Sequence, residues 1–167
     1  MPDLVPWFLV LHVLGAIIAF GPTFSLTVIR DLGRAEPMHG NFATRVSAAI
    51  SDRRVIPVAL TMPVTGIGLI WSVGIDPFSR GARWLLLGIV LYLIALTYSL
   101  TIQKSAVGRI IAMTASPPPS PAPGSAPSAP PPALMGAIRT VQRGAILLLG
   151  LITAIVFLMV AKPDLGF

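Results

Sequence analysis

Cysteine is absent from this chain of 167 residues, and charged side chains make up only 11% of it. Without cysteine the protein forms no disulfide, carries no thiolate nucleophile and has no cysteine-ligated metal or cluster. A soluble domain has about a quarter charged residues, so this chain has too few polar side chains to cover a water-facing surface. The shortage of charged side chains predicts a protein that is embedded in a membrane.

Charge is also missing from long stretches of the chain. Residues 7–29 contain no Asp, Glu, Lys or Arg, and as a helix they would be about 34 Å long, enough to cross a hydrocarbon layer of about 30 Å. Three further apolar segments follow. We therefore predict an all-α membrane protein, an antiparallel four-transmembrane-helix bundle that forms a single domain. The predicted transmembrane helices are residues 4–29, 55–74, 84–102 and 145–161.

Two of the segments outside these spans have a recognisable pattern. Residues 42–51 place Phe42, Val46 and Ile50 on one helical face, which predicts an interfacial helix lying on the bilayer surface. Residues 116–133 are dominated by proline, which prevents a regular helix and favours polyproline II or disorder. We interpret this Pro-rich segment as a linker between the third and fourth helices.

Basic residues are distributed unevenly between the two sides of the predicted bundle. Residues 30–54 and 103–144 carry nine Lys and Arg, whereas the opposite side carries three. Cytoplasmic loops of membrane proteins are enriched in these residues. We therefore expect a multi-pass protein of the cell membrane with these two loops in the cytoplasm and both termini outside. The net charge of +6 then favours anionic lipid head groups as partners, and no nucleic-acid partner is expected.

Four polar side chains fall at similar distances from the ends of the predicted spans. His12, Tyr92 and Thr153 lie eight residues from an end and Thr65 lies nine, so in alternating helices all four should sit about 12 Å below one membrane face. Each belongs to a stripe of small or polar residues, which is typical of packed membrane helices. If the stripes face inward, the four side chains form one layer, with Met62 about one turn deeper than Thr65.

His12 is the main candidate site residue because an ionisable side chain inside a span is costly and is associated with function. A neutral imidazole can ligate haem iron or copper or relay protons. It can equally have a structural role, hydrogen-bonded to Tyr92 or a threonine. The other histidine, His39, lies in a predicted loop. A haem held by two histidines would therefore need His12 from two copies, and a His/Met metal site could use Met62.

The predicted spans contain no acid, and no Lys or Arg away from their ends. This pattern argues against a proton-pumping chain of carboxylates and against a transporter of charged substrates. A Gly-rich phosphate loop, paired carboxylates and a Ser/His/Asp set are missing as well, so water-soluble hydrolase or kinase chemistry is not expected. The sequence leaves enzymatic activity open and favours its absence.

Several short motifs resemble a bacterial family of four-span integral membrane proteins, domain of unknown function 2269. The similarity covers nearly all of the chain except the Pro-rich segment. More distantly, a first-span His followed by Gly is similar to CopD-like copper-resistance proteins and HemJ-type protoporphyrinogen oxidases, and that resemblance implies copper or haem b held by His12. Unlike them, this chain has no histidine in its later spans. The matching motifs are His12-Val13-Leu14-Gly15 with Gly21, residues 57–66, Trp84-Leu85 and residues 157–163.

Three functions remain open at this point. The first is a redox protein that binds haem or copper through His12. The second is a structural or accessory subunit that packs through its small-residue stripes, as a homo-oligomer or against a membrane partner. The third is a small-molecule permease, which the sequence favours least.

Overall fold

The computed structural model describes residues 2–115, 130–163 and 165, and within them all regular secondary structure is helical. Four of these helical stretches are long and apolar enough to cross a membrane. The all-α fold and the four membrane helices predicted from the sequence are thus confirmed. The α-helices are α1 (Val5–Ala35), α2 (Gly40–Ile50), α3 (Ile56–Val73), α4 (Arg83–Tyr98), α5 (Lys104–Met113) and α6 (Pro132–Ala161), with 3₁₀ turns at Pro2–Leu4, Pro37–His39 and Arg80–Ala82.

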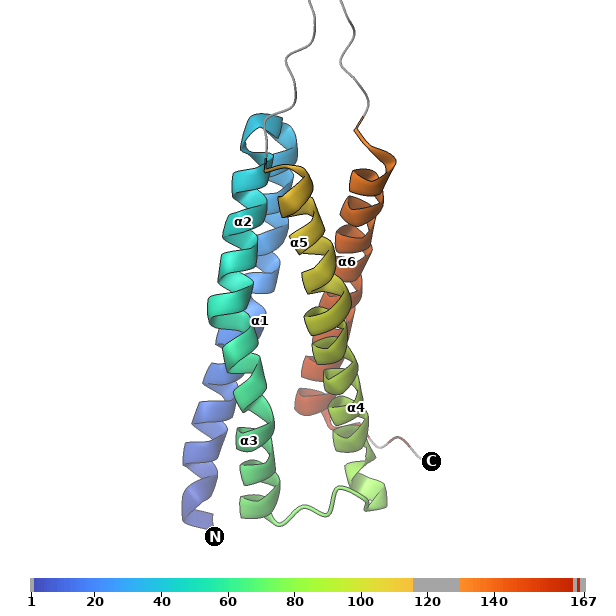
Figure 1. The fold of residues 1–167 in the computed structure, drawn as a ribbon. Coiled ribbons are helices and arrows are strands. Elements are labelled where there is room, and N and C mark those ends of the chain that lie inside the picture. Colours follow the sequence, from blue (N-terminus) through green and yellow to red (C-terminus); the bar gives the residue numbers. More distant parts are fainter. Residues whose placement is uncertain (1, 116–129, 164, 166–167) are drawn as a thin grey trace, which may run out of the picture.

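Two of the four stretches are made of helices joined without a break. A π-helical segment, Ser51–Val55, connects α2 to α3, and a second one, Ser99–Gln103, connects α4 to α5. The resulting stretches, Gly40–Val73 and Arg80–Met113, have 34 residues each, or about 51 Å of helix. Figure 1 shows them running beside α1 and α6 as antiparallel rods, with both described ends of the chain at the same end of the bundle.

The structure differs from the sequence-based expectation at the predicted interfacial helix. A helix does form there, but α2 continues through the π-helical segment into α3 and packs lengthwise on α1. The reason is local: Gly33 approaches Gly40 and Ala43 so closely that a side chain at Gly33 would lie 2.8 Å from the Ala43 Cβ. This close glycine contact holds α2 alongside α1 in antiparallel orientation, so α2 prolongs α3 instead of lying across the bundle.

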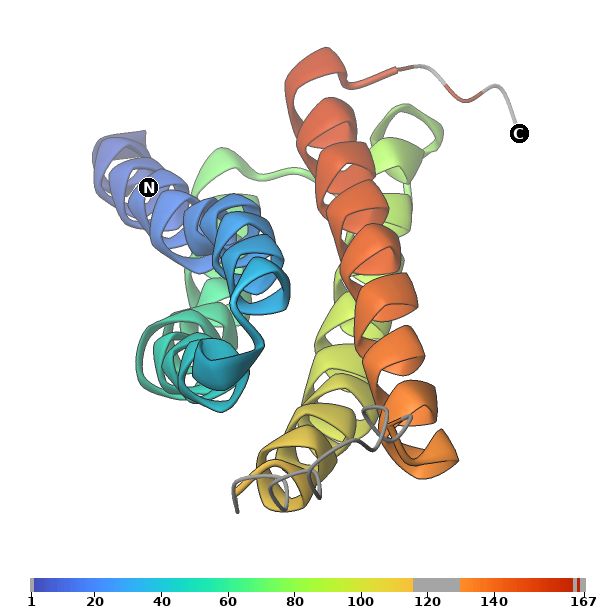
Figure 2. The same cartoon turned by 90° about the horizontal axis from the view of Figure 1, so that it is seen from above.

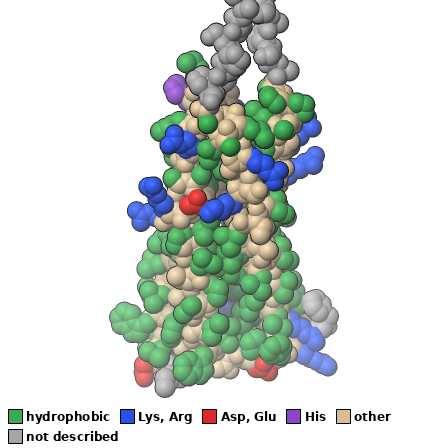
Figure 3. All heavy atoms as spheres, viewed as in Figure 1, with side chains coloured by type: hydrophobic (Ala, Val, Ile, Leu, Met, Phe, Trp, Pro, Cys, Tyr) green, Lys and Arg blue, Asp and Glu red, His purple; other side chains and the backbone are tan. Residues whose placement is uncertain are grey.

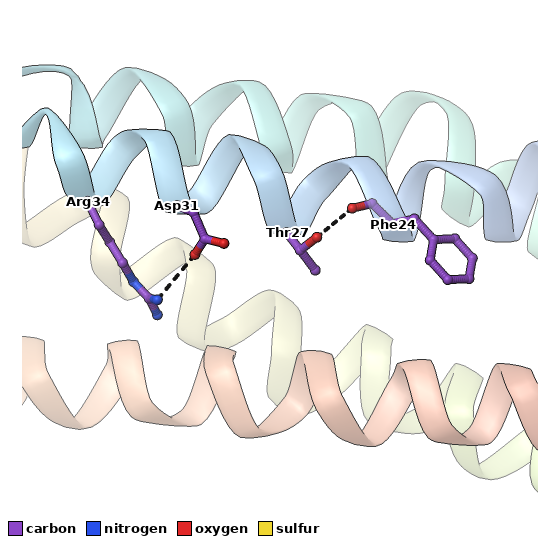
Figure 4. A network of polar contacts seen from close by, with 4 residues as sticks. All are labelled: Phe24, Thr27, Asp31 and Arg34. Atoms are coloured by element: carbon purple, nitrogen blue, oxygen red, sulfur yellow. Dashed lines mark hydrogen bonds and ion pairs between the residues drawn. The ribbon is translucent and has the colours of Figure 1, made fainter.

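The helices therefore extend beyond the uncharged spans at one end of the bundle, which we call the basic end. It comprises residues 30–54, 104–113 and 132–143 and holds nine Lys and Arg against three carboxylates. Figure 3 shows charged side chains over this part of the surface and a hydrophobic band below it. Where α1 enters the basic end, Asp31 and Arg34 form an ion pair of 3.3 Å (Figure 4). Since the remaining uncharged helix lengths match the hydrocarbon layer, the basic end projects out of the bilayer.

Exposed aromatic side chains mark the other boundary of the apolar layer. Trp7 and Trp71 are 70% and 72% exposed, and tryptophan is enriched where a span meets the lipid head groups. From Trp7 to Arg30 along α1 is 23 residues, about 34 Å of helix. This spacing agrees with one hydrocarbon layer between the aromatic side chains and the basic end.

The four rods associate as two hairpins, α1 with α2 and α3, and α4 and α5 with α6. Seen from above, the two hairpins stand side by side (Figure 2). At the basic end Lys104 Nζ contacts Asp52 Oδ1 at 2.8 Å, and the Asn41 amide donates to the Thr114 hydroxyl at 2.8 Å. Polar contacts thus join the hairpins where both reach water.

Most of the predicted Pro-rich linker, residues 116–129, lies outside the described residues. Its last part differs from the expectation, because α6 begins at Pro132 instead of after residue 133. A proline is tolerated there since the first-turn N–H groups of a helix have no intrahelical acceptor.

We predict that the basic end faces the cytoplasm. Single cysteines introduced into this cysteine-free chain test it: Met38→Cys, whose native side chain is 95% exposed at the basic end, and Ser79→Cys, exposed at the opposite end. In intact cells an impermeant maleimide should label Ser79→Cys at once and Met38→Cys only after permeabilisation, because basic loops are retained inside. The unmodified chain is the negative control, and the reverse labelling pattern would contradict the orientation.

Candidate functional site

The closest helix packing around His12 is between α1 and α3. Glycines on the two helices receive large side chains of the facing helix: a Cβ at Gly68 would lie 2.3 Å from the Phe8 ring, and a Cβ at Gly66 would lie 3.4 Å from the His12 ring. Small residues let membrane helices approach in this way. The glycines of α3 therefore fix the position of the imidazole against that helix.

His12 and Thr65 form a hydrogen bond between the two helices. The His12 Nδ1 atom lies 2.9 Å from Thr65 Oγ1, which also lies 3.0 Å from the Met62 carbonyl oxygen. A hydroxyl has one hydrogen, so when Thr65 donates it to the Met62 carbonyl, Nδ1 is the donor to Thr65. The neutral imidazole then carries its proton on Nδ1 and keeps a free lone pair on Nε2.

Met62 occupies the neighbouring turn of the same interface. Its side chain is 6% exposed, and its sulfur packs at Gly15, where a Cβ would lie 2.7 Å away. His12 and Gly15 are one turn apart on α1, as are Met62 and Thr65 on α3. The structure thus places the imidazole and the thioether at successive levels between α1 and α3.

Tyr92 crosses from α4 to α3 but does not reach the level of His12. Its hydroxyl donates to the carbonyl oxygen of Ala59. Pro63, four residues along α3, has no N–H to donate to that carbonyl, so the tyrosine satisfies a backbone acceptor that would otherwise be unpaired in the apolar layer. Ala59 lies six residues from Thr65, about 9 Å along the helix. Tyr92 therefore links the two hairpins about 1.7 helical turns away from the level of His12.

Thr153 does not join the predicted layer. It is exposed, and its hydroxyl donates to the Leu149 carbonyl of its own helix at 2.9 Å. Gly150 and Phe157 lie on the same face of the helix as Thr153, yet Phe157 is 60% exposed and a Cβ at Gly150 would meet nothing within 4 Å, so this face is not the packed one. The packed face of α6 consists of Ala137, Val141, Gly144, Ile152, Ile155 and Leu158. Of the four residues, only His12 and Thr65 are brought together.

The structure contains a second polar cluster, beside Gly144, that the sequence analysis did not predict. The Gln103 amide oxygen and the Tyr98 hydroxyl both pack against Gly144, where a Cβ would lie 2.2 and 2.6 Å from them. The Gln103 amide donates to the Val141 carbonyl at 3.3 Å, while its oxygen is buried with no hydrogen-bond partner. In the sequence, the signal of this cluster is Gly144, a small residue that directly follows Arg143 at the start of the fourth apolar span.

The metal-ligating side chains of the described residues are few and dispersed. No group of three or more His, Asp or Glu side chains in the described part of the chain is arranged to hold a metal ion. His39 lies at the basic end, where it contacts Glu36 at 3.1 Å. His12 Nε2 and the Met62 sulfur are therefore the soft or borderline ligands that lie at one helix interface inside the apolar layer, whereas Met159 packs at Gly88.

Comparison with known proteins gives one result. A family model described as a predicted integral membrane protein, DUF2269, matches residues 7–163. No curated protein and no solved structure matches the chain. The match supports the membrane location and the nearer of the two resemblances seen in the sequence.

We predict that Tyr92 stabilises the protein by compensating for Pro63. Tyr92→Phe leaves the buried Ala59 carbonyl unpaired and should lower the free energy of unfolding by about 1–3 kcal/mol. In a Pro63→Ala background a backbone N–H is restored to that carbonyl, so the same substitution should cost much less. Denaturant titration in detergent, evaluated as a double-mutant cycle, measures the difference. Equal losses in both backgrounds would contradict the pairing.

Proposed function

The chain belongs to the DUF2269 family of predicted integral membrane proteins, and we propose that it binds haem or copper within the bilayer through His12. The ligating atom in this proposal is Nε2. The supporting observation is the hydrogen-bond chain from His12 Nδ1 through the Thr65 hydroxyl to the Met62 carbonyl, which leaves the Nε2 lone pair available. A histidine that ligates a metal commonly donates its other N–H to a fixed oxygen in this manner.

Haem b and copper would require different ligands from the chain. Haem iron would need an imidazole ligand from the protein, which His12 would supply, either alone or as His12 from each of two copies. Copper(I) prefers soft ligands such as a thioether together with an imidazole, and Met62 lies one turn along the same helix interface. Either group would supply one-electron redox chemistry, while His12, Thr65 and the glycines of α3 hold the ligand in place.

An accessory or structural role is the second candidate, and the exposure of α1 favours it. Most of its large apolar side chains are uncovered, with Val10, Leu11 and Ile17 between 52% and 60% exposed. In a membrane such side chains contact either lipid or another helix. Lipid does not drive helices together by hydrophobicity, so both neighbours are compatible with this exposure. A second copy or a partner subunit could therefore pack on α1.

We predict that the purified protein carries a His12-dependent chromophore or metal. In detergent the wild type should show a Soret band or bound copper, and His12→Ala should remove it because the ligating nitrogen is gone. His39→Ala is the matched control, since that side chain is 70% exposed at the basic end. Met62→Leu separates the two groups: copper would be lost and haem retained. A wild type without colour or metal would eliminate this proposal and leave the accessory role.

We also predict that Thr65 sets the tautomer of His12. In the metal-free protein, ¹⁵N spectra of the imidazole should show a protonated Nδ1 and an unprotonated Nε2. Thr65→Ser keeps the hydroxyl and should preserve this pattern, whereas Thr65→Val is close in shape but cannot accept a hydrogen bond, so the tautomers should mix. An unchanged spectrum in Thr65→Val would contradict the positioning role.

A further inference from the structure

We propose that the groove between α5 and α6 at the basic end binds the head group of one anionic phospholipid. The groove has a volume of about 430 Å³ and is separate from the His12 site. It begins at the second π-helical segment and follows the two helices away from the membrane. Its lining residues are Thr101, Ile102, Ser105, Ala106, Arg109, Met113, Ala133, Gly136, Ala137 and Thr140.

Small side chains create the groove. Ala106 and Ala137 are 3% and 7% exposed and belong to the packed contact between α5 and α6. On the α6 side a Cβ at Gly136 would meet nothing within 4 Å, so no side chain of the described residues fills that space. The close contact of α5 and α6 thus forms the bottom of the groove, and the space above it is not filled by side chains of the described residues.

One cation of the groove lacks a carboxylate partner. Arg109 Nη2 donates to the Ser105 hydroxyl at 3.2 Å. The three carboxylates of the basic end are each engaged elsewhere, in contacts with Arg34, His39 and Lys104. The other carboxylates among the described residues, Asp3 and Asp76, lie at the opposite end of the bundle. A planar guanidinium with free N–H groups is suited to a phosphate, which it can bind with two parallel hydrogen bonds.

The hydroxyl groups of the groove complement such a ligand. The hydroxyls of Thr101 and Thr140 donate to the Thr97 and Gly136 carbonyls of their own helices, so their oxygens remain as acceptors. Ser105 and Arg109 are the donors. A glycerol-type head group has both a phosphate to accept from these donors and hydroxyls to donate to the threonines.

The height of the groove identifies a lipid as its source of phosphate. Thr101 and Ile102 belong to the last uncharged turns before Lys104, where the hydrocarbon layer ends. Ser105 lies about 6 Å beyond Thr101 along the helix and directly follows Lys104, so it falls at the start of the layer of about 5–8 Å that the head groups occupy on each side. The Arg109 side chain extends back towards that level to reach Ser105. An anionic lipid can therefore enter sideways from the bilayer with its acyl chains still in hydrocarbon.

Native mass spectrometry of protein extracted from nanodiscs with equal amounts of phosphatidylglycerol and phosphatidylcholine tests this site. The wild type should retain phosphatidylglycerol in preference, and Arg109→Gln should reduce the retained amount about tenfold, the loss expected for a charge-assisted hydrogen-bonded contact. Arg139→Gln removes the same charge from an exposed position on α6 outside the groove and should have little effect. Equal losses in both variants, or no preference in the wild type, would overturn the proposal.

Two further arms separate the remaining explanations. Gly136→Leu fills the groove without changing the charge and should also abolish retention, while circular dichroism verifies that the helices remain folded. Retention that survives this substitution would show that the groove is not the binding site. Inorganic phosphate added in excess should not displace the lipid, because it lacks acyl chains. Displacement would assign the site to a free anion and contradict a lipid ligand.

Discussion

Hydrocarbon offers no hydrogen-bond partner to a peptide group, and the architecture of this protein follows from that constraint. Within the apolar layer the helices satisfy their own backbone groups except where a proline lies inside a helix, at Pro22 in α1 and Pro63 in α3. Pro63 interrupts the ladder of α3, and the carbonyl left unpaired at Ala59 is satisfied by Tyr92 from the neighbouring hairpin. The hydrogen bond that compensates for Pro63 thereby joins the two hairpins inside the membrane.

The polar side chains follow the same constraint. Thr65 and Thr153 both return their hydroxyl hydrogens to backbone carbonyls, which removes the cost of a free donor in lipid. At Thr65 this leaves the oxygen to accept from His12, and the imidazole is thereby oriented. At the basic end polar side chains of the two hairpins pair with each other, and an ion pair and an amide contact hold the hairpins together there.

Much of the fold could be predicted from the pattern of charge alone. The four uncharged stretches identified the membrane helices, and the two loops rich in arginine fall at one end of the bundle. The ends of the helices could not be predicted in the same way. Arg30 and Arg109 lay outside the predicted spans because charge cannot enter lipid, but helices continue through both of them, since a helix is equally able to stand in water. The contact of Gly33 with α2 keeps that extension upright.

The sequence by itself determined the membrane as solvent, the four spans and His12 as the unusual residue within them, because length and charge are properties of each segment alone. Only the tertiary structure decided which faces meet. Depth along a helix can be counted from the sequence, but the rotation of one helix against another depends on packing, so Thr65 meets His12 while Thr153 turns away. The pairing of Tyr92 with Ala59, and the groove beside Arg109, likewise exist because separate helices approach each other at particular small residues.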